Sequence, residues 1–456
     1  MKKIKFIVAL WIGKIVVILT KIIDKERGTN VPGAFAFKVS KDFISNFTNI
    51  DYEKVVFITG TNGKSTTNNM IVHCMRSAGK TVCTNIEGAN LITGIATAMI
   101  KYSNIWGKMK TEYLVFETDE RFLKYIHELL PAKNICITNI QKDQVQRNGE
   151  PDYIYQKIKN IIKDDINIYV NNQEPRSKSF EDFSKNVVYY GVEKNVKSFK
   201  KDDKYSVTMP CPKCNGKIKF DYYNVDNIGN FECTSCGHRS NNDIEFLAKN
   251  IDYSNNTFEC LGNTYKIDYV QPYFIYNYIL CIAICKKIGI SDDKIEQALR
   301  TFKNLSGRFE VVKYGDKRIK YVRMKQENPE TLQSALDFVC DDKEKKILVM
   351  GLSEVKDINP YYANTFYTFD CDFKKLKKAN IEKYICFSEA VAYDSANRLI
   401  YDGIPKEKIE IIPTENEKEV LDKIKEYKCN NIYLITLLKK FEEIKEEVKN
   451  RRGELT

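Results

Sequence analysis

The amino-acid sequence predicts an α/β protein with two parallel sheets, one in a larger central domain and one in a smaller C-terminal domain. Short apolar runs alternate with helix-length segments from residue 55 onward, a glycine-rich loop follows the first run, and a second series begins after residue 309. Continuous apolar strands separated by helices are typical of parallel sheets covered on both faces. With 456 residues, 43% of them hydrophobic, the chain can form several cores, which excludes global disorder.

Histidine is scarce and cysteine is frequent. The chain has 14 cysteines but only three histidines, His73, His127 and His238, which excludes a three-histidine zinc site and a His-Glu-x-x-His protease. Most cysteines stand alone inside apolar segments, which argues against a secreted disulfide scaffold and predicts a reducing, cytoplasmic location. The formal net charge of 72 − 61 = +11 suits an anionic partner such as a membrane surface.

Residues 1–50 are predicted to form an N-terminal helix and an arm. The uncharged runs Phe6–Gly13 and Ile15–Thr20 are shorter than the roughly 18–20 residues that a membrane span requires. On a helix, Lys3, Lys14 and Lys21 fall within about 20° of one another and form a narrow basic stripe. A helix packed on the body of the protein is favoured. Adsorption at the inner face of an anionic membrane and a true span are the alternatives.

The central domain is predicted to span residues 51–308 and the Rossmann-like C-terminal domain residues 309–456. The first series of strands is expected at residues 55–60, 113–118, 134–140, 166–172 and 187–191. An insertion with paired cysteines interrupts this pattern at residues 205–240. Helices are expected at residues 271–305. The second series is expected at residues 346–353, 384–389, 409–414 and 431–436. A charged helix, expected to be solvated, ends the chain.

The glycine-rich loop is predicted to bind phosphate. It consists of Gly60, Thr61, Asn62, Gly63, Lys64, Ser65 and Thr66, directly after the first strand. Glycines allow a tight turn whose N–H groups, with the following helix N-terminus, surround phosphate oxygens. Lys64 is expected to reach the β- and γ-phosphates of ATP, and Ser65 to ligate Mg²⁺. Ile58 stands where the general pattern has another glycine, so the loop is a shortened variant; an incidental glycine-rich turn is the weaker alternative.

Four cysteines in the insertion have metal-ligand spacing. Cys211, Cys214, Cys233 and Cys236 form a C-x₂-C-x₁₈-C-x₂-C pattern. Two such knuckles can place four thiolates tetrahedrally around a structural Zn²⁺, with Gly216 and Gly237 relieving the turns. The alternative is that these cysteines have a redox role or form disulfides. His238 is not expected to be a metal ligand. The other ten cysteines, such as Cys281 and Cys285, are interpreted as buried packing residues.

The loop resembles the ATP loop of Mur ligases and folylpolyglutamate synthetases, and further segments match these families in order. The matching residues are Glu117, Thr138-Asn139-Ile140 with Asp143, Asn171 to Pro175, Tyr276-Asn277 and Gly307-Arg308-Phe309-Glu310. The resemblance implies a Mur-ligase central domain in which Glu117 binds Mg²⁺ and the loop, Asn277 and Arg308 contact ATP.

At several positions the chain departs from the general Mur-ligase pattern and resembles the MurT family of ligase subunits. Gln144 replaces a histidine, Glu117-Thr118-Asp119-Glu120 resembles EVDE, and a four-cysteine ribbon interrupts the ATPase domain. This resemblance implies ATP-dependent amidation of the D-glutamate α-carboxylate of lipid II through an acyl phosphate, in peptidoglycan synthesis. It also implies a heterodimer with a GatD-like glutaminase. Asp119 and Glu120 are interpreted either as supporting residues around Mg²⁺ or as solvated residues at a strand end.

The C-terminal domain matches MurT less closely. The family contributes an aspartate to the partner's active site, for which Asp370 is the best candidate because Asn364 stands where an acid is expected. An ordinary loop aspartate is the competing interpretation. Arg398 to Gly403 matches an R-L-x-Y-x-G run, and Lys325 with Asn328-Pro329 resembles a K-N-P segment with two extra residues.

No histidine stands in a context suited to a glutaminase, so ammonia is expected from another chain. Two rival functions stay open. One is a stand-alone Mur-type or folylpolyglutamate-type ligase that adds an amino acid. The other is a nucleic-acid-binding ATPase, suggested by the charge and the cysteine ribbon but opposed by the shortened loop and by the lack of a basic–aromatic stripe.

Overall fold

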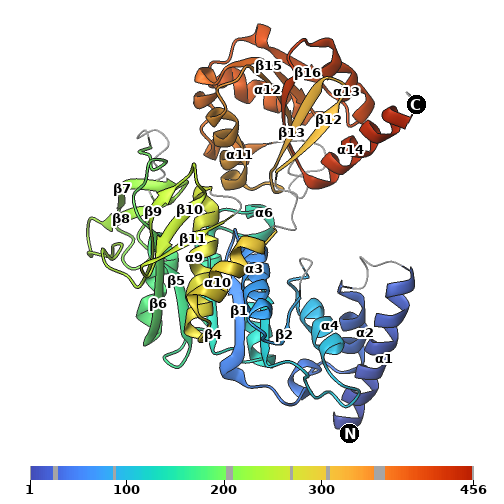
Figure 1. Cartoon of the computed structure of the whole chain (residues 1–456), viewed down its shortest axis with the longest axis vertical. Helices are drawn as coiled ribbons and strands as arrows, with labels where there is room; N and C mark the ends of the chain where they lie inside the picture. Colours follow the sequence, from blue (N-terminus) through green and yellow to red (C-terminus); the bar gives the residue numbers. More distant parts are fainter. Residues whose placement is uncertain are drawn as a thin grey trace. The chain divides into compact units, whose positions relative to one another are not determined.

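A computed structural model describes residues 2–23, 29–85, 89–201, 209–267, 271–303, 309–353 and 365–453. The described chain forms two compact units (Figure 1). The first contains the described residues up to Gln141 and those from Glu150 to Lys303. The second contains Lys142–Gly149 and the described residues from Phe309 onward. The short segment 142–149 is therefore grouped with the C-terminal unit, which the sequence pattern does not indicate; the predicted domain limits themselves stay a prediction.

The first unit is built on a nine-stranded sheet that is parallel from β2 to β9 and ends in two antiparallel strands. In sheet order the strands are β11 (Asn263–Lys266), β10 (Thr257–Cys260), β9 (Phe246–Asp252), β6 (Asn186–Val192), β5 (Asn167–Asn171), β4 (Asn134–Ile137), β1 (Val55–Thr59), β3 (Tyr113–Glu117) and β2 (Val82–Cys83). All five predicted strands of the first series are present.

Helices cover both faces of this sheet. Along β1, Val56 and Ile58 enter the core shared with α3 and α9, while Val55 and Phe57 enter the core on the opposite face, as the two-residue period of a strand requires. The helices of the unit are α1 (Lys2–Ile23), α2 (Val31–Val39), α3 (Lys64–Ser77), α4 (Ile92–Tyr102), α5 (Leu123–Leu129), α7 (Pro151–Lys159), α8 (Pro175–Ser179), α9 (Pro272–Lys287) and α10 (Asp292–Thr301).

The N-terminal helix α1 packs on α2 and α4, which is the favoured interpretation of the sequence. Its buried side chains include Phe6, Leu10 and Val17. The Lys14 amine donates hydrogen bonds to the carbonyls of Ile100 (2.8 Å) and Ser103 (2.9 Å), near the C-terminus of α4, where a helix dipole favours a cation. The expected basic stripe is therefore interrupted, because Lys14 points into the protein. Among the described helices, none has the length and apolar content needed to cross a membrane.

The cysteine insertion forms a separate hairpin between β6 and β9. Its strands β7 (Ile218–Val225) and β8 (Ile228–Cys233) pair in an antiparallel two-stranded sheet. A small apolar cluster of Cys211, Ile218, Phe231 and Cys233 is too small to hold this hairpin by burial alone.

The second unit is a six-stranded sheet with helices on both faces, as the second series predicts. It is parallel except for the hairpin β12–β13. In sheet order the strands are β12 (Phe309–Tyr314), β13 (Lys317–Arg323), β17 (Asn431–Thr436), β14 (Lys346–Gly351), β15 (Ile381–Phe387) and β16 (Ile409–Ile412). Its α-helices are α6 (Val145–Asn148), α11 (Pro329–Asp341), α12 (Val391–Tyr401), α13 (Glu417–Glu426) and α14 (Leu438–Gly453).

The terminal helix α14 is not merely solvated, so this expectation is wrong. Phe441, Ile444 and Val448 are buried at a spacing of three and four residues, which places them on one helix face. The Phe441 ring stacks on Tyr321 of β13 with centroids 3.9 Å apart. The charges of this helix occupy its other faces, and the apolar stripe closes one side of the C-terminal core.

Short 3₁₀ helices join the elements of both units. They are η2 (Ile44–Asn46), η3 (Tyr52–Lys54), η4 (Phe180–Phe183), η5 (Phe366–Asp370), η6 (Lys374–Lys378) and η7 (Lys406–Lys408).

Candidate functional site

The predicted phosphate loop lies between β1 and α3, at the carboxyl edge of the parallel sheet. Gly60 and Gly63 adopt positive φ angles of 117° and 88°, which L-residues rarely tolerate. Side chains at either position would also clash: a Cβ at Gly60 would lie 2.7 Å from the Asn139 carbonyl, and a Cβ at Gly63 would lie 3.3 Å from Asn277 Cγ and closer still to its Oδ1. Both glycines are thus required by conformation and by space.

The neighbouring strand end holds the loop in shape. The Thr61 N–H donates to the Asn139 carbonyl (2.8 Å), and the Asn62 N–H donates to Asn139 Oδ1 (3.1 Å). In return, Asn139 Nδ2 donates to the Asn62 carbonyl (3.0 Å). The Thr61 hydroxyl and Gln141 add a reciprocal pair of 3.1 and 2.9 Å. The predicted Thr138-Asn139 segment therefore supports the loop, and Gln141 supports it in a way that the sequence analysis missed.

Lys64 is nearly buried, and its amine folds back over the loop. It donates to the carbonyls of Gly60 and Thr61 and forms an ion pair with Glu120 Oε2 (3.1 Å). Glu120 is only 5% exposed, so it is not a solvated strand-end residue. The ion pair keeps the Lys64 amine beside the loop.

Glu117 ends β3 beside the loop, since its Cα pairs with Ile58 of β1. The Asn85 side chain fixes its backbone: Asn85 Nδ2 donates to the Glu117 carbonyl (2.8 Å), and the Glu117 N–H donates to Asn85 Oδ1 (3.0 Å). Sequence reasoning missed Asn85, although a polar residue two positions after a short strand at this sheet edge is a usable signal. Among the described residues, no side chain is bonded to the buried Glu117 carboxylate.

Asp119 is committed to a local ion pair. Arg121 donates to both of its carboxylate oxygens, Nε at 2.9 Å and Nη2 at 2.6 Å. Burial alone would raise the pKa of Asp119, but the Arg121 hydrogen bonds outweigh it and lower this pKa below its usual value. The structure thus separates the two acids: Glu120 faces Lys64, and Asp119 faces Arg121.

Polar groups around the loop fit a bound nucleotide. The Thr66 hydroxyl and Asn277 Nδ2 are buried without a hydrogen-bond partner among the described residues, and such groups are costly unless a ligand satisfies them. The first N–H groups of α3 have no partner within the helix, and its dipole favours an anion there. Ser65 is half-buried at the second position of α3. Arg308 lies outside the described residues, as does Asn364.

The Asp143-Gln144 segment is bound by residues of the second unit. Asn328 Nδ2 donates to Asp143 Oδ1 (2.9 Å), and the Gln144 N–H donates to the Glu327 carbonyl (3.2 Å). The Asn328 side chain also caps α11, because its Oδ1 accepts from the Thr331 N–H (2.8 Å). The Asn328-Pro329 pair noticed in the sequence therefore begins α11 and anchors segment 142–149.

Asp370 ends η5 and is exposed, with an ion pair to Lys142 Nζ (3.0 Å). Arg398 of the R-L-x-Y-x-G run fixes the same segment. Its guanidinium donates to the Thr368 carbonyl (3.2 Å) and the Cys371 carbonyl (2.8 Å), and pairs with the buried Asp402 (2.8 Å). The run thus positions the loop that carries Asp370.

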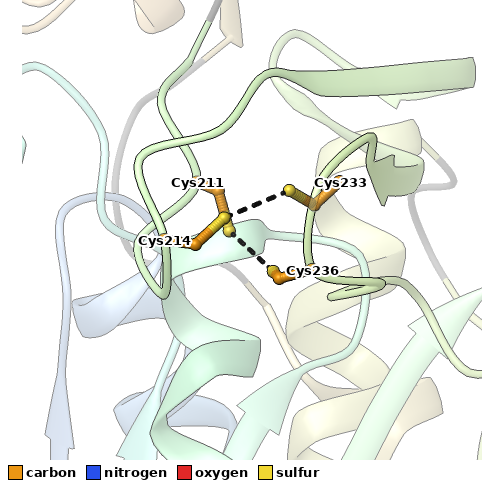
Figure 2. A group of neighbouring side chains, drawn as sticks. All are labelled: Cys211, Cys214, Cys233 and Cys236. Atoms are coloured by element: carbon orange, nitrogen blue, oxygen red, sulfur yellow. Dashed lines mark hydrogen bonds between the residues drawn. The ribbon is translucent and has the colours of Figure 1, made fainter.

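The four cysteines of the insertion come together (Figure 2). Their Sγ atoms all lie within 4.8 Å of one another, with Cys211 and Cys236 at 3.7 Å and Cys214 and Cys233 at 3.6 Å. Tetrahedral Zn–S bonds of about 2.3 Å require sulfur–sulfur distances of about 3.8 Å. The geometry therefore fits one Zn²⁺ with no open position.

Backbone N–H groups point at two of these sulfurs. The Gly216 N–H donates to Cys214 Sγ and the Ser235 N–H to Cys233 Sγ, both at 3.4 Å. Burial would raise the pKa of Cys233, but N–H donors and neighbouring thiols outweigh it and lower this pKa to about 6. The left-handed turn residue after the first knuckle is Asn215 (φ 60°) and not Gly216, whose smallness instead avoids a clash with Ser235.

In the described structure the three histidine rings contact backbone carbonyls and not the cysteine sulfurs, although the His238 carbonyl accepts from the Cys233 N–H (2.7 Å). His238 Nε2 is 2.9 Å from the Pro175 carbonyl, and His73 Nε2 is 3.0 Å from the Ala298 carbonyl. His127 Nε2 is 3.1 Å from the Ala132 carbonyl. Each ring is thus engaged with a backbone carbonyl.

Most of the other cysteines are buried, as expected, although Cys340 and Cys429 are only half-buried. Cys74, Cys281 and Cys285 lie within 4.8 Å of one another in the apolar core between α3 and α9.

Comparison with known proteins assigns both units. A model of the Mur ligase middle domain matches residues 58–234, and a model of the MurT ligase C-terminal domain matches residues 326–437. The chain has the domain pair of a MurT-type ligase. The predicted resemblance is thereby confirmed.

Curated relatives agree with this assignment. The chain is 27% identical to the MurT subunit of lipid II isoglutaminyl synthase (glutamine-hydrolyzing) from Staphylococcus aureus strain COL, over 79% of this chain and 80% of the relative. It is 28% identical to the subunit of the same name from Streptococcus pneumoniae, over 93% of each. These names confirm the predicted enzyme class, a ligase.

Solved structures show the same fold at low identity. A pseudomurein peptide ligase type C from Methanothermus fervidus superposes with a TM-score of 0.66 and 19% identity, over 90% of this chain and 81% of that one. MurF ligase from Thermotoga maritima in complex with ADP has a TM-score of 0.58 and 16% identity, over 92% and 85%. The Mur ligase fold predicted for the chain is therefore confirmed.

Proposed function

We propose that this chain is the ATP-dependent amidating subunit of a lipid II isoglutaminyl synthase in peptidoglycan synthesis. The observation that carries the proposal is the combination, in one chain, of a formed phosphate loop with a MurT-type C-terminal domain. The acceptor is the α-carboxylate of D-glutamate in the lipid II stem peptide, and the product is D-isoglutamine. The amidation takes place in the cytoplasm, at the inner face of the membrane that holds the lipid-linked acceptor.

The reaction has two steps. A carboxylate oxygen attacks the γ-phosphorus of ATP, the bond to the β-phosphate oxygen breaks, and an acyl phosphate and ADP form. Ammonia then attacks the acyl carbon, the carbon–oxygen bond to phosphate breaks, and the nitrogen loses a proton. Both steps depend on positioning and on neutralising phosphate charge, for which the site has a loop, a lysine and an acidic side chain that would hold a cation.

Each loop residue has a role in this scheme. The amides from Gly63 to Thr66 surround the phosphates, while those of Thr61 and Asn62 hold the loop against Asn139. The Lys64 amine exchanges its loop carbonyls for phosphate oxygens. Ser65 and Glu117 would hold Mg²⁺, which supplies charge neutralisation when bound. Asn277, which lies against Gly63, is proposed to contact the nucleotide, and the same role is proposed for Arg308.

Ammonia is proposed to come from a separate GatD-like glutaminase in a heterodimer. Among the described residues, no histidine hydrogen-bonds to a cysteine. The described residues therefore do not contain the Cys–His pair that usually activates the nucleophile of a glutaminase. Asp370 is proposed to complete the partner's site, supported by the way in which Arg398 and Asp402 hold its loop. The limits of the central domain, residues 51–308, and of the C-terminal domain, residues 309–456, are part of the same proposal.

The cysteine cluster is proposed to hold a structural Zn²⁺. The fit of the sulfur–sulfur distances and the small apolar core of the hairpin support this role. Because four thiolates fill the coordination sphere, the metal contributes folding energy and no chemistry.

A stand-alone ligase that adds an amino acid is the second candidate. It is favoured by relatives such as the UDP-N-acetylmuramate–L-alanine ligase of Hydrogenobaculum, 24% identical over 82% of this chain and 71% of the relative. The MurT-type C-terminal domain favours amidation instead.

The test compares nitrogen donors with the purified chain, ATP and lipid II. Ammonium should support ATP consumption and an amidated product, whereas a panel of amino acids should not. Lys64→Ala should lower ATP turnover by at least about 100-fold. Since this change strands the buried Glu120, the double variant Lys64→Ala/Glu120→Gln tests the same loss in a folded protein. ATP turnover with an amino acid and not with ammonium would establish the second candidate.

A further inference from the structure

Helix α1 has a second apolar face that no part of the described chain covers. Six of its side chains, between 45% and 70% exposed, are Ile4, Val8, Trp11, Ile15, Ile18 and Leu19. At about 100° per residue they fall within an arc of roughly 100°. A continuous apolar stripe along 16 residues differs from isolated exposed hydrophobic side chains, which need no explanation.

Packing of the opposite face prevents α1 from turning this stripe inward. Phe6 and Leu10 are buried against the body of the first unit. A Cβ at Gly13 would lie 2.6 Å from Ile100 Cδ1, and the Lys14 amine is bonded to two carbonyls at the end of α4. The rotation of the helix is therefore fixed, and its outer stripe faces away from the unit.

A loop after α4 extends the same surface. Ile105 and Trp106 are 54% and 62% exposed, and Trp11 Nε1 donates to the Ile105 carbonyl (2.9 Å). The rings of Trp11 and Trp106 lie 6.2 Å apart, between centroids. Gly107 packs so closely on Phe6 that a Cβ would lie 2.5 Å from its ring. The chain has two tryptophans, and both lie on this surface.

Most charges around the stripe are positive, although Asp42 lies within range of Lys2. Residues 2–23, 29–41 and 89–111 contain no acidic side chain. Their lysines are Lys2, Lys3, Lys5, Lys14, Lys21, Lys38, Lys41, Lys101, Lys108 and Lys110. Of these, Lys2, Lys3 and Lys5 are exposed beside the start of the stripe, and Lys108 is exposed beyond Trp106. Such a surface is complementary to an anionic one.

We propose that this tryptophan face, the outer stripe of α1 with Ile105 and Trp106, lies on the anionic surface of a phospholipid membrane. Indole rings favour the boundary between headgroups and acyl chains, and lysines beside them meet anionic headgroups. An apolar face with basic edges lies in the membrane plane and does not cross the bilayer. The proposal deepens the proposed function, since it names the surface that brings the site to a lipid-linked acceptor. The observations behind it are independent of the amidation chemistry.

Intrinsic fluorescence tests the proposal directly, because all tryptophan emission of the chain comes from this face. The full-length protein is mixed with vesicles of phosphatidylglycerol and phosphatidylcholine, or of phosphatidylcholine alone, without ATP or lipid II. Anionic vesicles should shift the emission to shorter wavelength, and brominated acyl chains should quench it. Added salt should weaken the binding, since exposed charges are screened.

In a vesicle sedimentation assay, variants separate the contribution of the apolar stripe from that of the lysines beside it. Ile15→Ser/Ile18→Ser should lower partitioning by at least about tenfold, whereas Val196→Ser, a change at an 88% exposed site elsewhere in the first unit, should not. Lys3→Gln/Lys5→Gln should weaken binding to anionic vesicles about fivefold per lysine, and Lys439→Gln on α14 should have no effect.

Two outcomes would overturn the proposal. One is emission that anionic vesicles leave unchanged. The other is an emission shift without vesicles that grows with protein concentration or follows addition of a glutaminase subunit, since the face would then bind a second copy or a protein partner. Because no acceptor or ATP is present, failure here leaves the amidation proposal standing. Failure of amidation with vesicle binding retained would reject only the proposed function.

Discussion

Replacing Gly63 by alanine should disable the phosphate loop far more than it destabilises the protein. Gly63 precedes α3 at φ 88°, and Gly79 follows the same helix at φ 86°. An alanine at either position bears the cost of left-handed backbone, about 1–2 kcal/mol. A Cβ at Gly79 meets no atom within 4 Å, whereas one at Gly63 meets the buried Asn277 amide. Gly79→Ala is therefore a matched control in which only the backbone cost applies.

The difference between the two variants measures the contact with Asn277. To restore a normal separation from the new Cβ, the Asn277 amide or the loop must move by about 1 Å, and a displacement of this size can lower a rate about 100-fold. Gly79→Ala should lose about 1–2 kcal/mol in urea unfolding, and Gly63→Ala should lose this amount together with the cost of displacing Asn277. ATP turnover, measured by phosphate release with ammonium and acceptor, should fall about 100-fold only in Gly63→Ala. Equal turnover in the two variants would refute the role assigned to this loop.

Three further predictions follow from other parts of the molecule. Wild-type protein should contain about one equivalent of zinc. Cys211→Ser should lose the metal and solubility while Cys340→Ser keeps both; a full zinc content in Cys211→Ser would exclude the proposed metal site. In Arg121→Gln, the pKa of Asp119 should rise relative to the wild type, because burial remains while the guanidinium hydrogen bonds that lower this pKa are lost. Because the wild-type carboxyl, with its lowered pKa, stabilises the fold only when ionised, the deficit in unfolding free energy should be largest above about pH 4 and shrink below it. A deficit independent of pH in urea unfolding would contradict this. Asp370→Asn should reduce amidation supported by glutamine and the partner subunit but not amidation supported by ammonium, and equal losses with both donors would assign Asp370 a structural role.

Strands such as β1, β3 and β4 could be predicted because each is buried along its whole length and is therefore a continuous apolar run. The parallel strands β2, with only two residues, and β9, whose second half is polar and partly exposed, were not predicted. Antiparallel strands were missed where their residues alternate. Polar and buried positions alternate over the four residues of β10, β11 has one buried residue, Tyr265, among polar ones, and Leu261 and Gly262 turn between the two strands with positive φ. Runs this short carry too little pattern to distinguish a strand from a loop. The amphipathic stripe of α14 was hidden in the same way, since three buried side chains stand among many charges.

The candidate loop was predictable because its chemistry is local in sequence: two glycines, a lysine and a serine stand in one turn. Its supporting contacts were not, since they join distant segments. Asn85 fixes Glu117 across 32 positions, and Glu120 pairs with Lys64 across 56. Segment 142–149 is held by Asn328, 185 positions from Asp143. Such pairings depend on which strand ends meet at the sheet edge, which one sequence does not specify.

Isotope transfer tests the central claim most directly. Lipid II labelled with oxygen-18 in the D-glutamate α-carboxylate is incubated with the purified chain, ATP and ammonium, and the released phosphate is examined by mass spectrometry. If the carboxylate attacks ATP and ammonia displaces the phosphate, each phosphate released carries one labelled oxygen and the stem peptide gains an amide. Amide formation with unlabelled phosphate would contradict the acyl-phosphate route. Labelled phosphate formed only when an amino acid replaces ammonium would contradict the amidating function.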